Sequence, residues 1–258
     1  MFVGAGTSGR LGVLESAEMP PTFGTDADLV LAIMAGGKNA FLKTKEGVED
    51  NYEEGARSVM RLRPTKRDVV IGVSASGMTP FVRGALTRAR RAGSRIIFVT
   101  CDPRTELQSF VDLTIAPAVG PEVIAGSTRL KAGTATKLVL NALTTLTMVR
   151  LGKVYGNRMV DVSVSNSKLE DRALRILEDL GGVVGEQAHA PCQLLRRRSG
   201  AVVDQRSDRH AVGEAVADLH RLDLGQDVVQ VLPGGLGVRD QGVGRDAPPR
   251  AGVDARSG

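Results

Sequence analysis

Short apolar runs and helical patterns alternate from the start of the chain to about residue 151. Apolar runs without strict alternation predict strands buried on both faces, at residues 29–35, 68–74, 94–100 and 112–116. Helical patterns lie between these runs, at 9–19, 39–45, 52–62, 80–92, near Glu106, and in a long stretch that ends at about Leu151. This alternation predicts an α/β fold with a mostly five-stranded parallel sheet that is covered by helices on both faces.

The first strand of that sheet would be short. Only residues 1–3 precede a glycine-rich loop, whereas a buried strand usually has about four to eight residues. We therefore expect the chain as given to begin inside a longer protein.

Two loops rich in small hydroxylated residues follow predicted strands. The stretch 4–24, GAGTSGRLGVLESAEMPPTFG, places Thr7 and Ser8 where a strand gives way to a helix, and residues 74–79, SASGMT, repeat this arrangement. Backbone N–H groups and hydroxyls at a helix N-terminus favour a phosphate. Because ligands bind at the carboxyl ends of parallel strands, both loops are expected on one rim of the sheet, where they predict an anion site.

The same stretch matches a dinucleotide-binding pattern. Gly4, Gly6 and Gly9 spell GxGxxG, but a lone match of this kind is weak. That pattern also needs an acidic residue about 20 positions further on, at the end of the second strand, to bind a ribose. Here Asp26 and Asp28 precede the second apolar run, so a dinucleotide is disfavoured.

Charged residues gather at two other places. An acidic cluster around the start of the helix at 52–62 is ordinarily explained by the helix dipole and by solvation; it contains Glu46, Glu49, Asp50, Glu53 and Glu54. The start of the long helix carries Ser127, Thr128, Arg129 and Lys131. Two cations there oppose the helix dipole, which favours a role facing an anion, although surface charge or a subunit interface would also explain them.

Composition excludes several classes of protein. Apolar residues make up 42% of the 258 residues, enough for a core. Aromatic residues make up 3%, and the net charge of +5 is spread along the chain, so a nucleic-acid partner is not expected. Cys101 and Cys192 are too few for a disulfide framework or a zinc site, which fits a reducing cytoplasm. No apolar run reaches membrane-spanning length, so no membrane partner is expected either.

The composition changes at residue 181. From there to the end the chain contains no Lys, Ile, Met, Asn, Phe or Tyr, all of which the preceding part uses. We therefore expect a domain at 1–180 followed by a tail at 181–258 that is either a disordered extension or the product of a frameshift.

Three segments together closely resemble the N-acetylmuramic acid 6-phosphate etherases, which belong to the sugar isomerase (SIS) domain superfamily. They are GAGTSGRLGVLESAEMPPTFG, VSASGMTPFV and GPEVIAGSTRLKAGTATKLVLNALTTLTMVRLGKVYGNRMVDV, and the match runs from Met1 to about Arg175. The resemblance implies a SIS-type three-layer αβα sandwich. It further implies a cytoplasmic homodimer, without a metal or redox cofactor, that cleaves the D-lactyl ether of an amino sugar phosphate with water.

The resemblance also assigns residues. In ESAEMPP it gives Glu18 the role of the acid that protonates lactate, and in EGVED it gives Glu49 the role of the base at C2. The SxSGxT turn that binds sugar phosphates in SIS domains falls on Ser74, Ser76, Gly77 and Thr79. Taken without the resemblance, Glu18 could be a surface acid at a helix end, and Ser76 and Thr79 could cap the following helix.

The chain departs from the family pattern at Met19, where the family has cysteine, and at Met78, where it usually has arginine. Two rival functions share the fold. A non-catalytic sugar-phosphate sensor, like the glucokinase regulatory proteins, would keep the hydroxyl loops but would not need both acids. An aldose–ketose isomerase would also need a base at C2, but it would not explain ESAEMPP or GSTRLKAGTA.

Overall fold

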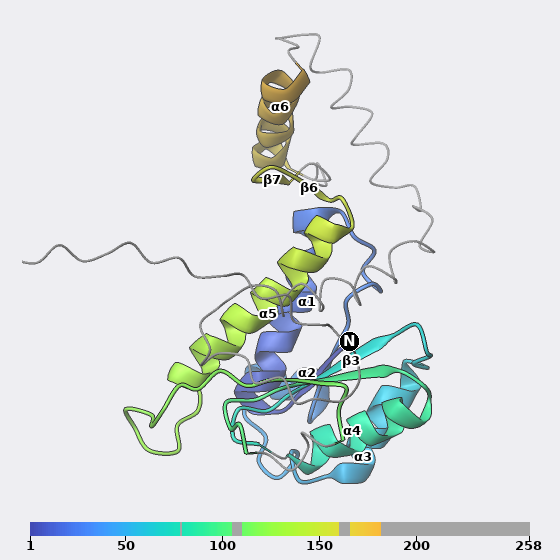
Figure 1. The fold of residues 1–258 in the computed structure, drawn as a ribbon, viewed down its shortest axis with the longest axis vertical. Helices are drawn as coiled ribbons and strands as arrows, with labels where there is room; N and C mark the ends of the chain where they lie inside the picture. The colour runs from blue at the N-terminus through green and yellow to red at the C-terminus, as the bar shows by residue number, and fades with distance from the viewer. Residues whose placement is uncertain (78, 105–109, 160–165, 182–258) are drawn as a thin grey trace, which may run out of the picture.

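The computed structural model describes residues 1–77, 79–104, 110–159 and 166–181, and the elements below lie within these ranges (Figure 1). The expected short helix near Glu106 and the tail at 182–258 lie outside them. In chain order the elements are β1 (Phe2–Gly4), α1 (Gly6–Phe23), β2 (Ala32–Met34), α2 (Gly37–Leu42), α3 (Tyr52–Arg61), β3 (Val69–Val73), α4 (Pro80–Arg91), β4 (Arg95–Val99), β5 (Leu113–Ile115), α5 (Lys131–Arg150), β6 (Val154–Tyr155), β7 (Arg158–Met159) and α6 (Ser167–Gly181).

The main sheet has five strands in the order β2-β1-β3-β4-β5, and each neighbouring pair is parallel. This confirms the predicted parallel sheet. The chain moves outward from β1 to β2 and then returns to place β3 on the other side of β1. In open sheets of this kind the ligand crevice lies at the carboxyl ends of the strands, where the strand order reverses, here between β1 and β3.

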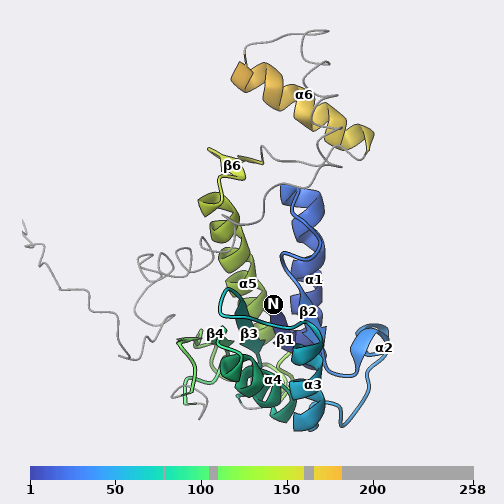
Figure 2. The ribbon, with the colours of Figure 1, turned by 90° about the vertical axis from the view of Figure 1, so that its right-hand side faces the viewer.

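Helices cover both faces of the sheet, which confirms the three-layer sandwich. Figure 2 shows α3 and α4 below the sheet and α1 and α5 above it. Alternate strand residues divide between the two layers, as the twofold period of a strand requires. Val3, Val70 and Phe98 pack towards α3 and α4, whereas Phe2 and Ile97 pack on the opposite face with α5.

The boundaries of three predicted elements were wrong. Helix α1 begins at Gly6 and not at Gly9, so Thr7 and Ser8 lie in its first turn rather than in a loop. At its other end it continues through Pro20 and Pro21 to Phe23, and Gly24 caps it in the left-handed conformation with a φ of 60°. The strand expected at 29–35 is only Ala32–Met34. The helix expected at 39–45 is Gly37–Leu42, because Gly36 and Gly37 make the turn after β2 and the helix begins within it.

The short hairpin of β6 and β7 and helix α6 were not predicted as separate elements, and they lie beyond the ends of α1 and α5 (Figure 2). Arg158 on β7 forms an ion pair with Asp179 on α6, with 3.0 Å between the charged atoms. Among the described residues, no helix is both long and apolar enough to span a membrane.

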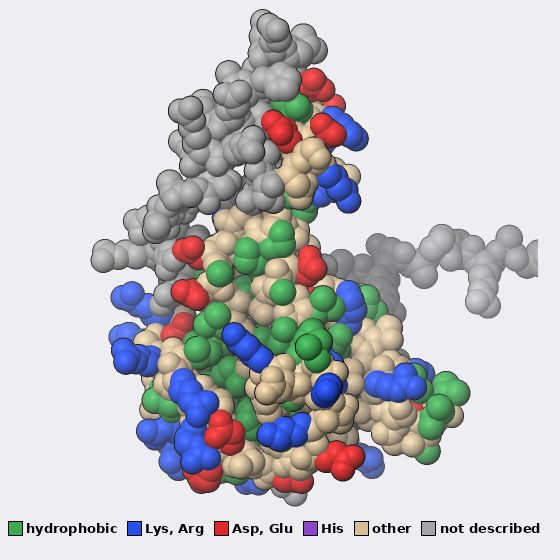
Figure 3. Space-filling model, turned by 180° about the vertical axis from the view of Figure 1, so that it is seen from behind, with side chains coloured by type: hydrophobic (Ala, Val, Ile, Leu, Met, Phe, Trp, Pro, Cys, Tyr) green, Lys and Arg blue, Asp and Glu red, His purple; other side chains and the backbone are tan. Residues whose placement is uncertain are grey.

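Basic side chains are distributed over the surface rather than in one groove. Seen from behind, Lys and Arg side chains are scattered, with more of them along one lower edge (Figure 3). In the last turn of α4, Arg88, Arg90 and Arg91 place positive charge where it complements the helix dipole.

Candidate active site

The tight turn from β1 into α1 begins the site. Gly4 pairs with Val73 of β3, so the loops that follow these two strands start side by side. A Cβ atom at Gly4 would lie 2.7 Å from the Gly9 nitrogen, so only glycine lets the strand end pack this closely on the first turns of α1. This close contact holds the half-buried Thr7 and Ser8 at the carboxyl-end rim.

The turn after β3 brings its hydroxyls together. Ser74 is buried, and its Oγ lies 2.6 Å from the Oγ1 of Thr79. Gly77 has a φ of 92°, which glycine adopts without strain, and Ser76 is exposed. The expectation that Thr79 caps α4 was wrong for its side chain: Thr79 is the N-cap residue, but its hydroxyl contacts Ser74 instead of a free N–H group of the helix.

Glu49 lies at the same rim. Its backbone carbonyl accepts a hydrogen bond of 2.9 Å from the Phe81 N–H in the first turn of α4. Its neighbour Val48 packs against Gly36, which follows β2. The Glu49 side chain itself is exposed. The structure therefore brings Glu49 to the start of α4, directly after the Ser74–Thr79 turn.

The other acids of the cluster are placed differently. Glu53 and Glu54 lie in the first turn of α3, as the dipole explanation requires. Glu54 is engaged by Ser58, Arg57 and Arg61. The hydrogen bond from the Ser58 hydroxyl, helped by the two arginines, holds the pKa of Glu54 below its ordinary value.

The segment before α5 approaches the first loop. Helix α5 begins at Lys131, so Ser127, Thr128 and Arg129 precede the helix and do not occupy its first turn as expected. A Cβ atom built on Gly133 would lie 3.4 Å from the Thr128 carbonyl oxygen and 3.6 Å from Thr7 Cγ2. The loop that carries Ser127 and Thr128 therefore borders the first turn of α1, which carries Thr7.

The N-terminus of α5 already has an anion. The two carboxylate oxygens of Glu122 accept hydrogen bonds of 2.9 Å from the N–H groups of Lys131 and Ala132. These bonds, the Ala132 N–H first, and the nearby Lys131 ammonium hold the pKa of Glu122 below its ordinary value. Sequence reasoning missed Glu122 because it lies nine residues before the helix, far outside any local capping pattern.

Glu18 is not near the hydroxyl loops within one chain. It lies on the exposed side of α1, twelve residues beyond Gly6. With a rise of about 1.5 Å per residue, that places it about 18 Å along the helix from the first loop. A second acid one turn earlier, Glu15, is buried against α5, and sequence reasoning overlooked it.

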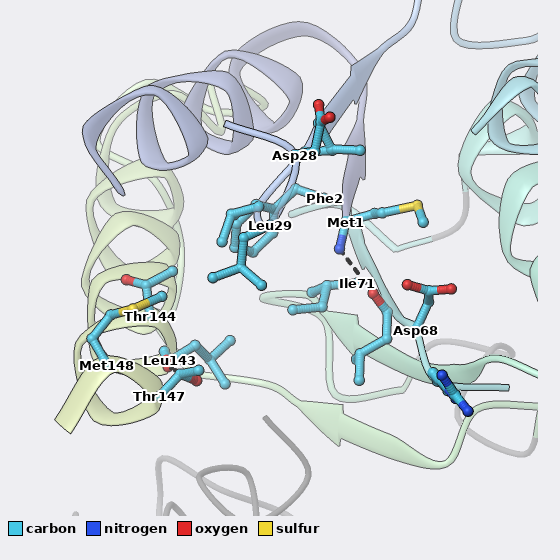
Figure 4. Close-up of a pocket in the computed structure, with 14 residues that line it drawn as sticks. Met1, Phe2, Asp28, Leu29, Asp68, Ile71, Leu143, Thr144, Thr147 and Met148 are labelled. Atoms are coloured by element: carbon cyan, nitrogen blue, oxygen red, sulfur yellow. Dashed lines mark hydrogen bonds between the residues drawn. The ribbon is translucent and has the colours of Figure 1, made fainter. Parts of the chain in front are cut away.

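A cavity of about 130 Å³ lies at the opposite rim, where the strands begin (Figure 4). Its walls are mostly apolar and include Phe2, Leu29, Ile71, Leu143 and Met148. The Met1 amine also lines it and donates a hydrogen bond of 2.8 Å to the Val69 carbonyl. Within the described ranges, no group of His, Cys, Asp and Glu side chains could hold a metal ion.

Comparison with known proteins gives two kinds of match. A family model described as the glucokinase regulatory protein N-terminal SIS domain matches residues 1–90. The similar curated proteins are named N-acetylmuramic acid 6-phosphate etherase. The protein of Trichormus variabilis is 54% identical over 199 residues, which are 77% of this chain and 64% of that protein.

Two further relatives are also named N-acetylmuramic acid 6-phosphate etherase. The protein of Thermosynechococcus vestitus is 56% identical over 199 residues, which are 77% of this chain and 63% of that protein. The protein of Crocosphaera subtropica is 54% identical over 231 residues, which are 90% of this chain and 71% of that protein. The chain thus spans less than two thirds of the length of several relatives and slightly more of another.

Proposed function

The chain belongs to the N-acetylmuramic acid 6-phosphate etherases, and on that basis we propose that it is a carbon–oxygen lyase. Its substrate is N-acetylmuramic acid 6-phosphate, an amino sugar phosphate. The protein cleaves the D-lactyl ether of this sugar with water, giving N-acetylglucosamine 6-phosphate and D-lactate. The reaction serves the breakdown and recycling of cell-wall amino sugars in the cytoplasm.

The carboxyl-end rim supports this proposal most directly. The hydroxyl loops after β1 and β3 start side by side at the point where the strand order reverses, and Glu49 is tied to the start of α4 next to them. Hydroxyls and N–H groups at helix starts suit a phosphate. We assign the phosphate to Thr7, Ser8, Ser74, Ser76, Gly77 and Thr79, with Ser127, Thr128, Arg129 and Lys131 around it.

The chemistry requires two groups that transfer protons. Opening of the sugar ring to its aldehyde makes the C2 proton acidic, and Glu49 removes it. The electron pair left at C2 forms a double bond to C3 and expels the lactate oxygen, which Glu18 protonates. Water then adds across this double bond, with its oxygen at C3. General acid or base help of this kind contributes about 10²- to 10⁴-fold for each group.

A homodimer would complete the site. In a single chain Glu18 lies about 18 Å along α1 from the first loop, farther than the phosphate lies from the C3 oxygen of one sugar. We propose that each active site combines Glu18 of one copy with the hydroxyl groups and Glu49 of the other copy. Closed twofold pairing allows this exchange, because each copy then supplies Glu18 to its partner.

Mixing two inactive variants tests this arrangement. Glu18→Ala chains and Glu49→Ala chains, refolded together in equal amounts, should recover about a quarter of wild-type activity, because half of the dimers contain one intact site of two. The two variants should be inactive when each is assayed alone. If the mixture also stays inactive, the two acids act within one chain and the shared site is wrong.

The reaction itself is tested in deuterated water. The wild-type protein is incubated with N-acetylmuramic acid 6-phosphate while lactate release and deuterium uptake at C2 are followed. The lyase predicts both signals. Binding without either signal would overturn the lyase and support the non-catalytic sensor; the SIS-domain match at residues 1–90 fits either function, because both share that fold. The names of the curated relatives, at 54–56% identity, favour the lyase.

A further inference from the structure

Helix α1 has an unusual buried stripe. Its buried residues, all within the described part of the chain, are Gly9, Gly12, Glu15, Met19 and Phe23. Two of these are glycines without side chains. In the middle of the helix the buried side chain is therefore a carboxylate, between the partly buried Leu11, which packs on the core, and Met19, which packs with Met148.

Glu15 is fully engaged by α5, which runs beside α1 (Figure 2). It is 4% exposed, and one carboxylate oxygen accepts a hydrogen bond of 2.7 Å from Asn141 Nδ2. The other oxygen accepts a hydrogen bond from the Thr144 hydroxyl. Asn141 in turn accepts a hydrogen bond of 2.7 Å from the Lys137 ammonium through its Oδ1. This fixes the direction of the Asn141 amide, so that its NH₂ group faces Glu15.

A buried polar network of this kind is weak evidence for stability, since an apolar replacement is often as stable. Its hydrogen bonds depend on direction, however, whereas apolar contacts tolerate small rotations. We therefore expect the network to hold the rotation of α1 about its own axis in the middle of the helix, between the close contact of Gly12 with Phe2 and the packing of Met19 with Met148.

Glu18 is the group that such a rotation would move. It lies three residues after Glu15, about 60° around the helix. Side chains end about 5–6 Å from the helix axis, so a rotation of about 10° displaces the Glu18 carboxylate by about 1 Å. A displacement of that size can cost up to about 10²-fold in rate.

We propose that Glu15, held by Asn141, Thr144 and Lys137, is a positioning residue that fixes the direction of the Glu18 carboxylate. This inference rests on the proposed function, because it assigns Glu15 a role through the acid of that reaction. Glu15 itself touches no substrate.

The test uses Glu15→Gln, which keeps the shape of the side chain but turns one acceptor of the network into a donor. We expect lactate release to fall about 10-fold or more, while deuterium uptake at C2, which depends on Glu49, stays within about twofold of wild type. Glu178→Gln on the exposed surface of α6 is the matched control and should change neither signal.

Lys137→Met provides a second variant that leaves Glu15 in place and frees the Asn141 amide to turn. Its lactate release should fall less than that of Glu15→Gln, again without loss of C2 exchange. The inference is overturned if both variants keep wild-type lactate release, or if release and exchange fall in the same proportion, which would indicate general loosening. Failure of the proposed function is distinguishable, because the wild-type protein itself would then release no lactate.

Discussion

The two rims of the sheet differ in what they offer a ligand. At the carboxyl-end rim, the strands lead into hydroxyl-bearing loops, and the Ser74 and Thr79 hydroxyls lie 2.6 Å apart. At the amino-end rim, the strands begin around a cavity of about 130 Å³ with mostly apolar walls (Figure 4). The rim that holds the cavity is therefore not the rim to which we assign the phosphate.

This difference shows that a cavity and the polar groups suited to a charged ligand can lie at opposite ends of one sheet. An apolar pocket is the usual first choice for a ligand site. The strand order, however, reverses between β1 and β3, and in parallel sheets the crevice this creates lies at the carboxyl ends. We favour that rim, because a charged sugar phosphate needs donors more than it needs apolar walls.

The largest effect is expected from Glu18→Ala. Lactate release should fall about 10²- to 10⁴-fold, because the departing oxygen loses its proton donor. Deuterium uptake at C2 should remain, since we assign that proton to a different carboxylate, Glu49. Glu18 is exposed, so the melting temperature should stay close to wild type. Lactate release at the normal rate would rule out Glu18 as the acid.

The amino-end rim is tested by Leu143→Ala. Leu143 is 4% exposed and lines the cavity, so truncation should cost about 2–5 kcal/mol of unfolding free energy, measured by urea denaturation. Assayed where the variant is folded, kcat and KM should match wild type. A KM change of tenfold or more would mean that the substrate uses this rim after all.

Gly9→Ala tests the close packing that shapes the first loop. The new Cβ would lie 2.8 Å from the Gly4 carbonyl oxygen and 2.9 Å from Met34 Cγ, so we expect a loss of about 1–3 kcal/mol in thermal or chemical unfolding. Gly133→Ala is the matched helical glycine on α5, where the nearest atom would be 3.4 Å away. If both substitutions cost the same, the close contact between Gly4 and Gly9 is not what shapes the loop.

Thr79→Val tests whether a hydroxyl at the carboxyl-end rim, rather than one at the amino-end rim, contributes to substrate binding. The variant keeps the shape of threonine but removes the partner of the Ser74 hydroxyl, so KM should rise about tenfold with little change in kcat, as expected for lost binding that is equal in ground and transition states. Thr147→Val removes a hydroxyl that lines the amino-end cavity. Steady-state kinetics in which Thr147→Val raised KM equally would contradict the assignment.

The smallest effect concerns pH. The pKa of Glu122 lies below its ordinary value in the folded chain because of the N–H groups at the start of α5, so its ionised form stabilises the fold. That contribution is present above about pH 4.5, the ordinary pKa, and is lost as the pH falls through the lower value of the folded state. Glu122→Gln should flatten this part of the melting-temperature profile; an unchanged profile would show that the cap contributes nothing.

The sequence predicted much of the fold because its signals are local. Apolar runs and helical periods gave the five parallel strands and placed α3 and α4 to within one residue, since Pro80 marks a helix start and Pro64 follows a helix end. The sequence also showed that hydroxylated residues follow two of the predicted strands. Because parallel strands end at the same edge of a sheet, the segments that follow them must lie on one rim. The family pattern singled out Glu18 and Glu49, but their roles stay predictions.

Tertiary structure decided what depends on residues far apart in the chain. Helix α1 continues through Pro20 and Pro21, against local preference, with Met19 and Phe23 packed on Met148. The partners of Thr79 and of the α5 N-terminus are nearer, at five and nine residues, but the pairing of Ser74 with Thr79 and the cap by Glu122 also lie outside local capping patterns. Glu15 is buried because Asn141 and Thr144 meet it from α5, more than 100 residues later. The hydrophobic periodicity of the sequence carries no information about such pairings. It shows which face of a helix or strand is apolar, but not which polar group of another element contacts that face.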